Sequence, residues 1–249
     1  MKDGLERIRE SGVVRLACRW DLTAEQFLHP DSGEPDGVVG RFGKRLAADL
    51  GVEPEFVVLE WDEQIPALLR HEVDVCPKHT NLPSRALDVD FSLGVLMEYE
   101  SVLLVREADA WQDERWLDQP ERQIAAVKGS LQEDAVMRRY PRASLVSTPD
   151  NDVASRWVET GKVDAAALDA GLYVPDGCRY LSGAAADQPL VIACDASHPC
   201  IAPGQGRLLR WLDNFMDFHE RSGGLAQLLK EAEAEHRRSR VAERGWASL

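Results

Sequence analysis

The chain has 249 residues, 44% of them hydrophobic and 29% charged, so it is long enough to bury a core without disulfides or bound metals. Its 29 lysines and arginines against 43 aspartates and glutamates give a formal net charge of −14 at pH 7. Such a charge repels nucleic-acid phosphates and anionic membranes, which leaves a small molecule or another protein as the better partner hypothesis. No stretch approaches the roughly 18 consecutive apolar residues of a membrane-spanning helix.

The cysteines and histidines give no sign of a metal or disulfide framework. Five cysteines cannot all pair with one another, and none lies in a C-x-x-C motif, so we expect buried, reduced thiols. The six histidines lack the spacing of metal ligands. We identify no catalytic residues and no cofactor-binding motif, and we expect neither a metal nor a cofactor.

Short β-rich runs alternate with helical patterns in the first third of the chain. Residues 13–18 are expected to form a strand, and the helix that follows ends at Gly51. A strand over 56–59, a helix that begins near Asp62 and a strand over 73–76 come next. This β-α-β-α-β order predicts a sheet that is largely parallel.

The same order returns in the second half, with strands expected over 124–127, 144–146 and 163–166 and helices between them. Two extended apolar runs, 101–106 and 189–194, enter and leave this second set. Two crossings of this kind are what a chain needs when one lobe is inserted into another. We therefore predict an α/β fold of two lobes, each a mostly parallel sheet flanked by helices, with the two crossing strands as a hinge.

These crossings set the expected lobe boundaries. Lobe 1 comprises residues 1–104 and 193–249, and lobe 2 comprises residues 105–192. Residues from about 231 onward are rich in glutamate, arginine and alanine, which predicts a solvated helical tail.

Several motifs, in this order along the chain, carry a family resemblance. They are the opening segment 5–15, the helix 61–69 with the strand after it, the segment 80–92 that holds Thr80, Arg85 and an Asp-Phe-Ser run, and the segment 161–164 with Asp169 five residues later. The sequence resembles the bacterial extracellular solute-binding proteins of the polar-amino-acid type, the ligand-capturing parts of ABC importers. The resemblance covers nearly the whole chain and implies the periplasmic-binding-protein-like fold.

The chemistry of an amino-acid ligand explains why Arg85 and Asp169 matter. A free amino acid carries a carboxylate and an ammonium on one carbon, and both need charged partners when they leave water. Arg85 can hold the carboxylate in bidentate fashion, and Thr80, five residues earlier, could share it. Asp169 either accepts from the ammonium or only caps the turn near Gly171. With the two charges on separate lobes, the ligand would favour the closed state.

The resemblance adds Trp61 and Lys78 to the expected ligand-binding residues. Trp61 either packs in the core or stacks on the ligand side chain. Lys78 stands where the family has a small residue. It either pairs with a local carboxylate such as Asp74 or recognises an extra acidic group on the ligand.

Lys128, Gly129 and Ser130 are also implied to line the pocket. They precede a helix in the second lobe, where free backbone N–H groups would suit an anionic group of the ligand. Lys128 is equally compatible with a solvated position at the end of a strand.

The implied function is non-catalytic: a monomeric protein captures an amino acid or a similar zwitterion for an ABC-type permease outside the cytoplasm. The chain shows no secretory signal, so it would be cytoplasmic if Met1 is the true start. One alternative is a lyase resembling cyclohexadienyl dehydratase, although the glutamate expected three residues after Asp169 is Leu172 here. Another is a free-standing ligand sensor that docks a partner through its tail.

Overall fold

The computed structural model describes residues 2–20, 25–29, 31–172, 174–183 and 188–246, with side chains described as far as residue 238. The chain forms two compact units. Unit 1 comprises Met1–Met97 and Ala196–Leu249, and unit 2 comprises Glu98–Asp195. The chain therefore divides at 97/98 and 195/196, a few residues from the positions expected from sequence.

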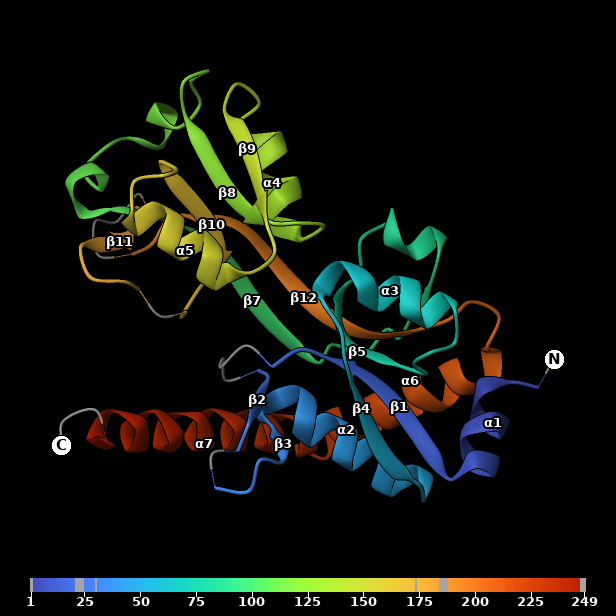
Figure 1. The fold of residues 1–249 in the computed structure, drawn as a ribbon. Helices are drawn as coiled ribbons and strands as arrows, with labels where there is room; N and C mark the ends of the chain where they lie inside the picture. Colours follow the sequence, from blue (N-terminus) through green and yellow to red (C-terminus); the bar gives the residue numbers. More distant parts are fainter. Residues whose placement is uncertain (1, 21–24, 30, 173, 184–187, 247–249) are drawn as a thin grey trace. The chain divides into compact units, whose positions relative to one another are not determined.

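Unit 1 contains most of the helices and two short stretches of parallel strand pairing. Its elements are α1 (Gly4–Ser11), β1 (Val13–Cys18), β2 (Phe27–Leu28), β3 (Pro35–Asp36), α2 (Gly37–Leu50), β4 (Glu53–Val58), α3 (Trp61–Leu69), β5 (Cys76–Thr80), the 3-10 turn Arg85–Leu87, β6 (Asp90–Phe91), α6 (Gly206–Arg221) and α7 (Gly224–Trp246). β1 pairs in parallel with β4, and Leu16 forms a parallel bridge to Val75 (Figure 1).

Unit 2 repeats the alternation of strands and helices. Its elements are the 3-10 turns Glu107–Asp109 and Glu114–Trp116, β8 (Gln123–Val127), α4 (Leu131–Arg139), β9 (Ser144–Thr148), α5 (Asn151–Glu159), β10 (Ala165–Asp169) and β11 (Cys178–Tyr180). β8 pairs in parallel with β9 and β10. The predicted α/β fold with two lobes is confirmed, although the largest sheet is mixed, because antiparallel strands flank its parallel ones.

Two long strands carry the chain between the units. β7 (Met97–Arg106) and β12 (Val191–Ile201) each contain one of the two unit boundaries. They are neighbours in the strand order, and β12 also pairs antiparallel with β5 and β6. The apolar run expected at 101–106 thus lies in β7, and residues 191–194 of the run expected at 189–194 lie in β12.

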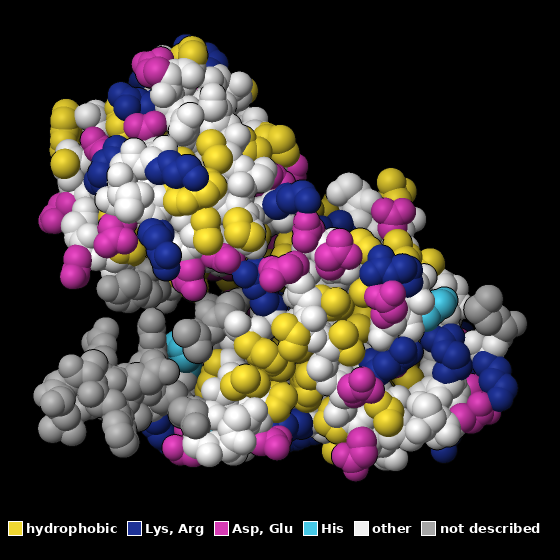
Figure 2. Space-filling model, viewed as in Figure 1, with side chains coloured by type: hydrophobic (Ala, Val, Ile, Leu, Met, Phe, Trp, Pro, Cys, Tyr) yellow, Lys and Arg dark blue, Asp and Glu magenta, His cyan; other side chains and the backbone are white. Residues whose placement is uncertain are grey.

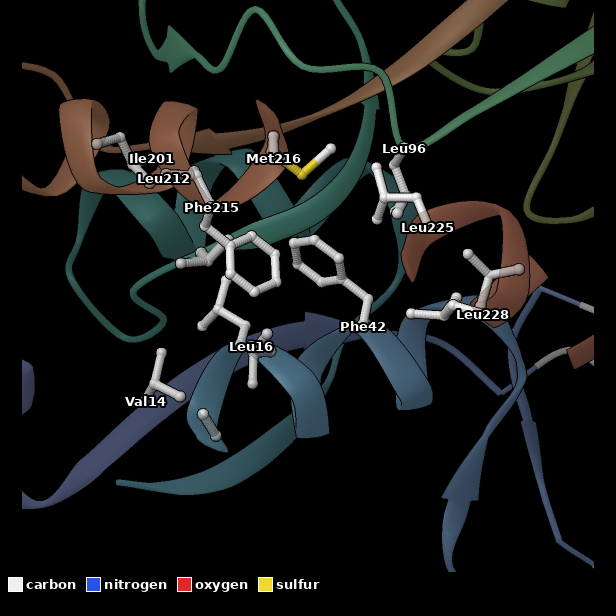
Figure 3. Packing of buried hydrophobic residues seen from close by; sticks show 14 of the residues in the cluster. Val14, Leu16, Phe42, Leu96, Ile201, Leu212, Phe215, Met216, Leu225 and Leu228 are labelled. Carbon is white, nitrogen blue, oxygen red and sulfur yellow. The ribbon is translucent and has the colours of Figure 1, made fainter. Parts of the chain in front are cut away.

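Each unit has its own apolar core. In unit 1, Val14 and Leu16 of β1 pack with Phe42 of α2 and with Phe215 and Met216 of α6 (Figure 3). In unit 2 the sheet is covered on both faces. Alternate residues of β8 and β10 face either the α4 side, with Val136 and Tyr140, or the α5 side, with Ala154 and Val158. This alternation is the two-residue period of a strand buried on both sides.

Both predicted strands 73–76 and 163–166 begin later in the structure, at Cys76 and Ala165. The same feature explains both shifts. In each unit the aspartate at the helix–strand corner uses its carboxylate to accept a backbone N–H: Asp74 accepts from Arg15 at 3.0 Å, and Asp164 accepts from Gln123 at 2.8 Å. Regular strand pairing starts beyond these corners.

The C-terminal tail is helical, as expected, but its first part is packed rather than solvated. Ala232 is fully buried, Glu231 pairs with Arg41 at 3.1 Å, and the ring of His236 lies 5.6 Å from that of Phe27. The prediction missed this packing because α2 and the β2–β3 hairpin, which α7 covers, lie far away in the sequence.

The surface matches the composition. On the face shown in Figure 2, the acidic and basic side chains of the described residues are interspersed over both units. Among the described residues, no helix is long and apolar enough to cross a membrane, and no group of histidine, cysteine, aspartate or glutamate is arranged to hold a metal ion.

Candidate functional site

The end of β5 brings three of the predicted residues together in unit 1. Thr80 is the last residue of the strand and is buried, and the chain then turns into the 3-10 turn that begins at Arg85. The Arg85 Nη1 atom donates a hydrogen bond to the Thr80 carbonyl oxygen at 3.2 Å. The guanidinium carbon of Arg85 lies 6.0 Å from the centroid of the Trp61 ring, within the range of a cation–π contact. The guanidinium is therefore held between a carbonyl and an aromatic face.

Trp61 starts α3 and is half-buried, with one face against the ring of His79. The two ring centroids are 4.2 Å apart with an interplanar angle of 31°. The Nε2 atom of His79 lies 3.1 Å from Oε1 of Gln64, so a hydrogen bond fixes the imidazole behind the tryptophan. Neither apolar cluster of unit 1 contains Trp61. This position does not agree with the core interpretation of Trp61, and stacking on a ligand stays a prediction.

His79 is a site residue that the sequence reasoning did not select. Burial, together with the positive charges of Arg85 and Lys78, lowers the pKa of His79 well below its usual value. The imidazole is therefore neutral at pH 7. Its Nδ1 atom has no hydrogen-bond partner among the described residues. Side chains alternate between the two faces of a strand, so His79 points away from the face shared by Lys78 and Thr80, and no local pattern indicated its contact with Trp61.

Lys78 forms an ion pair with Glu25, and both side chains are largely buried. The partner suggested from sequence, Asp74, is wrong: its carboxylate is held by the guanidinium of Arg15 at 3.0 Å. Four residues of extended chain span about 13 Å, which puts Asp74 out of reach of the Lys78 ammonium. Glu25 lies 53 residues before Lys78, and no local pattern could have selected it.

In unit 2, Asp169 is the last residue of β10, as predicted, and is half-buried. The Nε2 atom of Gln132 in α4 donates a hydrogen bond to Oδ1 of Asp169. Gln132 is itself buried, so this bond fixes the orientation of the carboxylate. The negative charge of Asp169 also contributes to the raised pKa of Tyr180, after the larger effect of burial.

Lys128, Gly129 and Ser130 connect β8 to α4. Ser130 is the N-cap of the helix, and its hydroxyl accepts the Glu133 N–H at 3.2 Å. The N–H of Gly129 donates to Oε2 of Glu133 at 2.7 Å, and the hydroxyl of Ser147 donates to the other carboxylate oxygen. We expected free N–H groups here; instead, the N–H groups of Gly129 and Glu133 are satisfied within the protein. Lys128 is exposed at the end of β8.

The predicted residues therefore form two groups. Unit 1 holds Trp61, Lys78, Thr80 and Arg85 around the end of β5, and unit 2 holds Lys128, Gly129, Ser130 and Asp169 at the ends of β8 and β10. The first group carries two cations, Lys78 and Arg85, and Lys78 forms an ion pair with Glu25. The second group carries the carboxylate of Asp169, which accepts from Gln132, and the start of α4, where Gly129 donates to Glu133.

Comparison with known proteins identifies relatives of the chain. It is 27% identical over 172 residues to the ABC transporter glutamine-binding protein GlnH of Bacillus subtilis, an alignment that covers 68% of this chain. The aligned part spans 62% of the length of that relative.

Two solved structures share the fold. The ancestral amino acid-binding protein AncCDT-1, a precursor of cyclohexadienyl dehydratase, has a TM-score of 0.77 at 26% identity, covering 92% of this chain and 99% of that one. An amino acid ABC transporter substrate-binding protein from Streptococcus pneumoniae, bound to L-arginine, has a TM-score of 0.78 at 22% identity, covering 94% and 98%.

The sequence profile of one family spans most of the molecule. It matches residues 18–232, which include β5, the 3-10 turn at Arg85 and the whole of unit 2. The family is described as one of solute-binding proteins, and the comparisons do not favour the lyase alternative. The chain belongs to the bacterial extracellular solute-binding proteins, family 3.

Proposed function

We propose that the chain binds an amino acid or a closely related zwitterion through Arg85 and Asp169 and supplies it to an ABC-type importer outside the cytoplasm. The observation that carries the proposal is the pair of strand ends. A fixed guanidinium follows β5 in unit 1, and an oriented carboxylate ends β10 in unit 2. A ligand with both charges on one carbon needs one group of each kind.

The α-carboxylate of the ligand would bind in unit 1. The planar fork of a guanidinium matches the two oxygens of a carboxylate, and Arg85 is held in place by the Thr80 carbonyl and the Trp61 ring. The side chain of the ligand would then pack against the face of Trp61 that His79 does not cover.

The ammonium of the ligand would bind to Asp169 in unit 2. Because Gln132 already donates to one oxygen of the carboxylate, the group needs little ordering when the ligand arrives. A ligand that contacts both units favours the closed arrangement over the open one, since only the closed one provides both charges.

The ion pair of Lys78 with Glu25 bears on the ligand side chain. Glu25 already neutralises the ammonium, so we expect no requirement for a second acidic group on the ligand. This supports the first of the two interpretations of Lys78, with Glu25 in place of Asp74.

The Bacillus relative, named as a glutamine-binding protein, and the Streptococcus structure, which is bound to L-arginine, support an amino-acid ligand. We also propose that the protein acts as a monomer and that its partner is the permease of an importer, as the name of the Bacillus relative suggests.

A thermal-shift screen with single amino acids would test the proposal. A ligand present at 100 times its dissociation constant should stabilise the protein by about 2.7 kcal/mol. Calorimetry with the best ligand should then show that Arg85→Ala and Asp169→Ala each weaken binding by about 2–5 kcal/mol, because each leaves a ligand charge unpaired.

Matched controls are available on the surface. Arg115 and Asp217 are mostly exposed, and their replacement by alanine should leave the affinity unchanged. The melting temperature of each ligand-free variant separates lost binding from lost folding. Wild-type affinity in either Arg85→Ala or Asp169→Ala would refute the site.

A further inference from the structure

Two cysteines lie directly opposite each other in unit 1. Cys76 opens β5, Cys200 lies in β12, and the two residues are partners in the antiparallel register. Both are fully buried, and the Cys76 thiol donates a hydrogen bond to the Gln64 carbonyl oxygen, which lies 3.5 Å from the sulfur. They are not bonded to each other in this structure.

The backbone geometry at this pair suits a disulfide. Directly opposed residues in an antiparallel pair have Cα atoms about 4.5–5.5 Å apart, and disulfides usually span Cα separations of about 4.4–6.8 Å. The strand register shifts between His198 and Cys200: one residue of β12, Pro199, stands against two residues of β5, Pro77 and Lys78, so the irregularity next to the pair is in β5. The two side chains also lie in a cluster of small and apolar residues, with Ala67, Leu68 and Val89, and a disulfide would replace the hydrogen bond from the Cys76 thiol to the Gln64 carbonyl oxygen.

We propose that Cys76 and Cys200 form a structural disulfide when the protein folds in an oxidising compartment. The inference rests on the geometry of this pair and on membership of an extracellular family, because disulfides persist in such compartments. It does not depend on which ligand the protein binds.

The bond would form by thiol–disulfide exchange. One cysteine attacks a disulfide donor as a thiolate and forms a mixed disulfide, and the second then displaces the remaining half of the donor. Two electrons and two protons pass to the donor, which leaves as two thiols. The chain loses two hydrogen atoms.

The exchange should precede burial. The neighbouring Cys200 thiol, together with burial, raises the pKa of Cys76, which leaves little thiolate in the folded protein at pH 7. Folded, reduced protein should therefore react slowly, whereas the unfolded chain should react during folding. The new link would close the loop from residue 76 to residue 200, which contains all of unit 2.

The test refolds the full-length, reduced chain in a mixture of oxidised and reduced glutathione, with reduced glutathione alone as the parallel sample. Alkylation under denaturing conditions and intact mass should show five reactive thiols in the reduced sample and three in the oxidised one. Peptide mapping should recover a linked pair that contains Cys76 and Cys200. The oxidised protein should melt about 5–15 °C higher, and a dithiol reductant should remove the gain.

Single variants sharpen the result. Cys200→Ala should abolish the link, whereas Cys194→Ala and Cys18→Ala should retain it, since neither residue faces Cys76 in the register. If Cys200→Ala does not fold, the peptide map of the wild type still decides. Five free thiols after oxidative refolding, a link to another cysteine, or equal melting temperatures for oxidised and reduced protein would overturn the proposal.

Discussion

Each unit has a helix–strand corner of the same kind, but the charged residue that follows or ends the next strand differs between the two units. In unit 1 the carboxylate of Asp74 accepts hydrogen bonds from the backbone and guanidinium of Arg15; in unit 2 Asp164 accepts from the backbone of Gln123 and the guanidinium of Arg122. Each aspartate thus ties the end of a helix to the first strand of its own unit.

Beyond these corners the chemistry is opposite. β5 leads to the guanidinium of Arg85, and β10 ends in the carboxylate of Asp169. The repeated corner fixes where each strand begins, and the residues at the strand ends set the charge. A similar backbone unit can therefore supply either half of a binding site for a dipolar ligand. The predictions below test how far this parallel holds.

The largest effect is expected at the corner of unit 1. The Asp74 side chain is only 3% exposed, whereas that of Asp164 is 17% exposed. Asp74→Ala should cost about 3–5 kcal/mol of stability, because it leaves the buried N–H of Arg15 and part of its guanidinium unpaired. Asp164→Ala should cost about 1–3 kcal/mol. Urea unfolding of both variants gives the comparison, and equal losses would show that the two corners are energetically equivalent.

The stability of the protein should depend on pH through His79 in unit 1. Because burial and two neighbouring cations lower the pKa of this histidine, the unfolded chain takes up its proton first as the pH falls. The contribution of His79 to the free energy of unfolding is complete above about pH 6.5, the pKa of histidine in the unfolded chain. It is lost progressively below that pH, by at most about 1.4 kcal/mol per pH unit.

His79→Gln should remove this part of the slope between pH 6.5 and pH 5, measured by urea unfolding at several pH values. NMR titration of the wild type provides an independent measurement. A ring resonance of His79 that titrates near pH 6.5 in the folded protein would contradict the prediction.

Ligand preference should respond to the ion pair of Lys78 with Glu25. Glu25→Gln leaves the Lys78 ammonium without its carboxylate partner, so the ratio of affinities for acidic over neutral amino acids should rise by about tenfold, or about 1.4 kcal/mol. Calorimetry with one ligand of each kind measures the ratio. Glu60→Gln is the control, since Glu60 pairs with Arg19 but is 64% exposed and should change the ratio less than about twofold.

The smallest effect is expected at the start of α4 in unit 2. Glu133→Gln weakens the bonds from Gly129 and Ser147, and should lower stability by about 0.5–1 kcal/mol. Asp134→Asn, in the same turn but paired only with the exposed Arg138, should cost less. Melting temperatures of the two variants measure the difference. An equal loss would show that the capping carboxylate of Glu133 stabilises the protein no more than the carboxylate of Asp134 does.

Local patterns predicted the order of elements well, because hydrophobic periodicity and Gly51 mark features that a few neighbouring residues determine. Arg85 and Asp169 could be selected as candidates because the motifs that contain them resemble those of a known family. Periodicity misplaced the starts of β5 and β10, because Val73 and Val163 are buried in the corners without belonging to the regular strands.

The features that escaped prediction depend on contacts between distant parts of the chain. Glu25 meets Lys78 across a loop, and Cys76 meets Cys200 only after the chain has passed through unit 2 and returned. Cys194 is exposed, contrary to the expectation of buried thiols, because it lies on β12 close to the boundary between the units. Side-chain partners of this kind follow from tertiary packing, which a single sequence does not specify.

The two crossing strands have a practical consequence for protein engineering. Unit 2 is one uninterrupted segment, and the residues at its ends are neighbours: the Tyr99 hydroxyl donates to Asp195 at 3.0 Å. If unit 2 were removed, the two chain ends left in unit 1 would also be close together, since the Ser197 hydroxyl lies 3.4 Å from the Met97 carbonyl oxygen. A short turn could therefore bridge residues 97 and 196, and each half could be produced as a separate polypeptide, so that its charge and its ligand contacts could be studied in isolation.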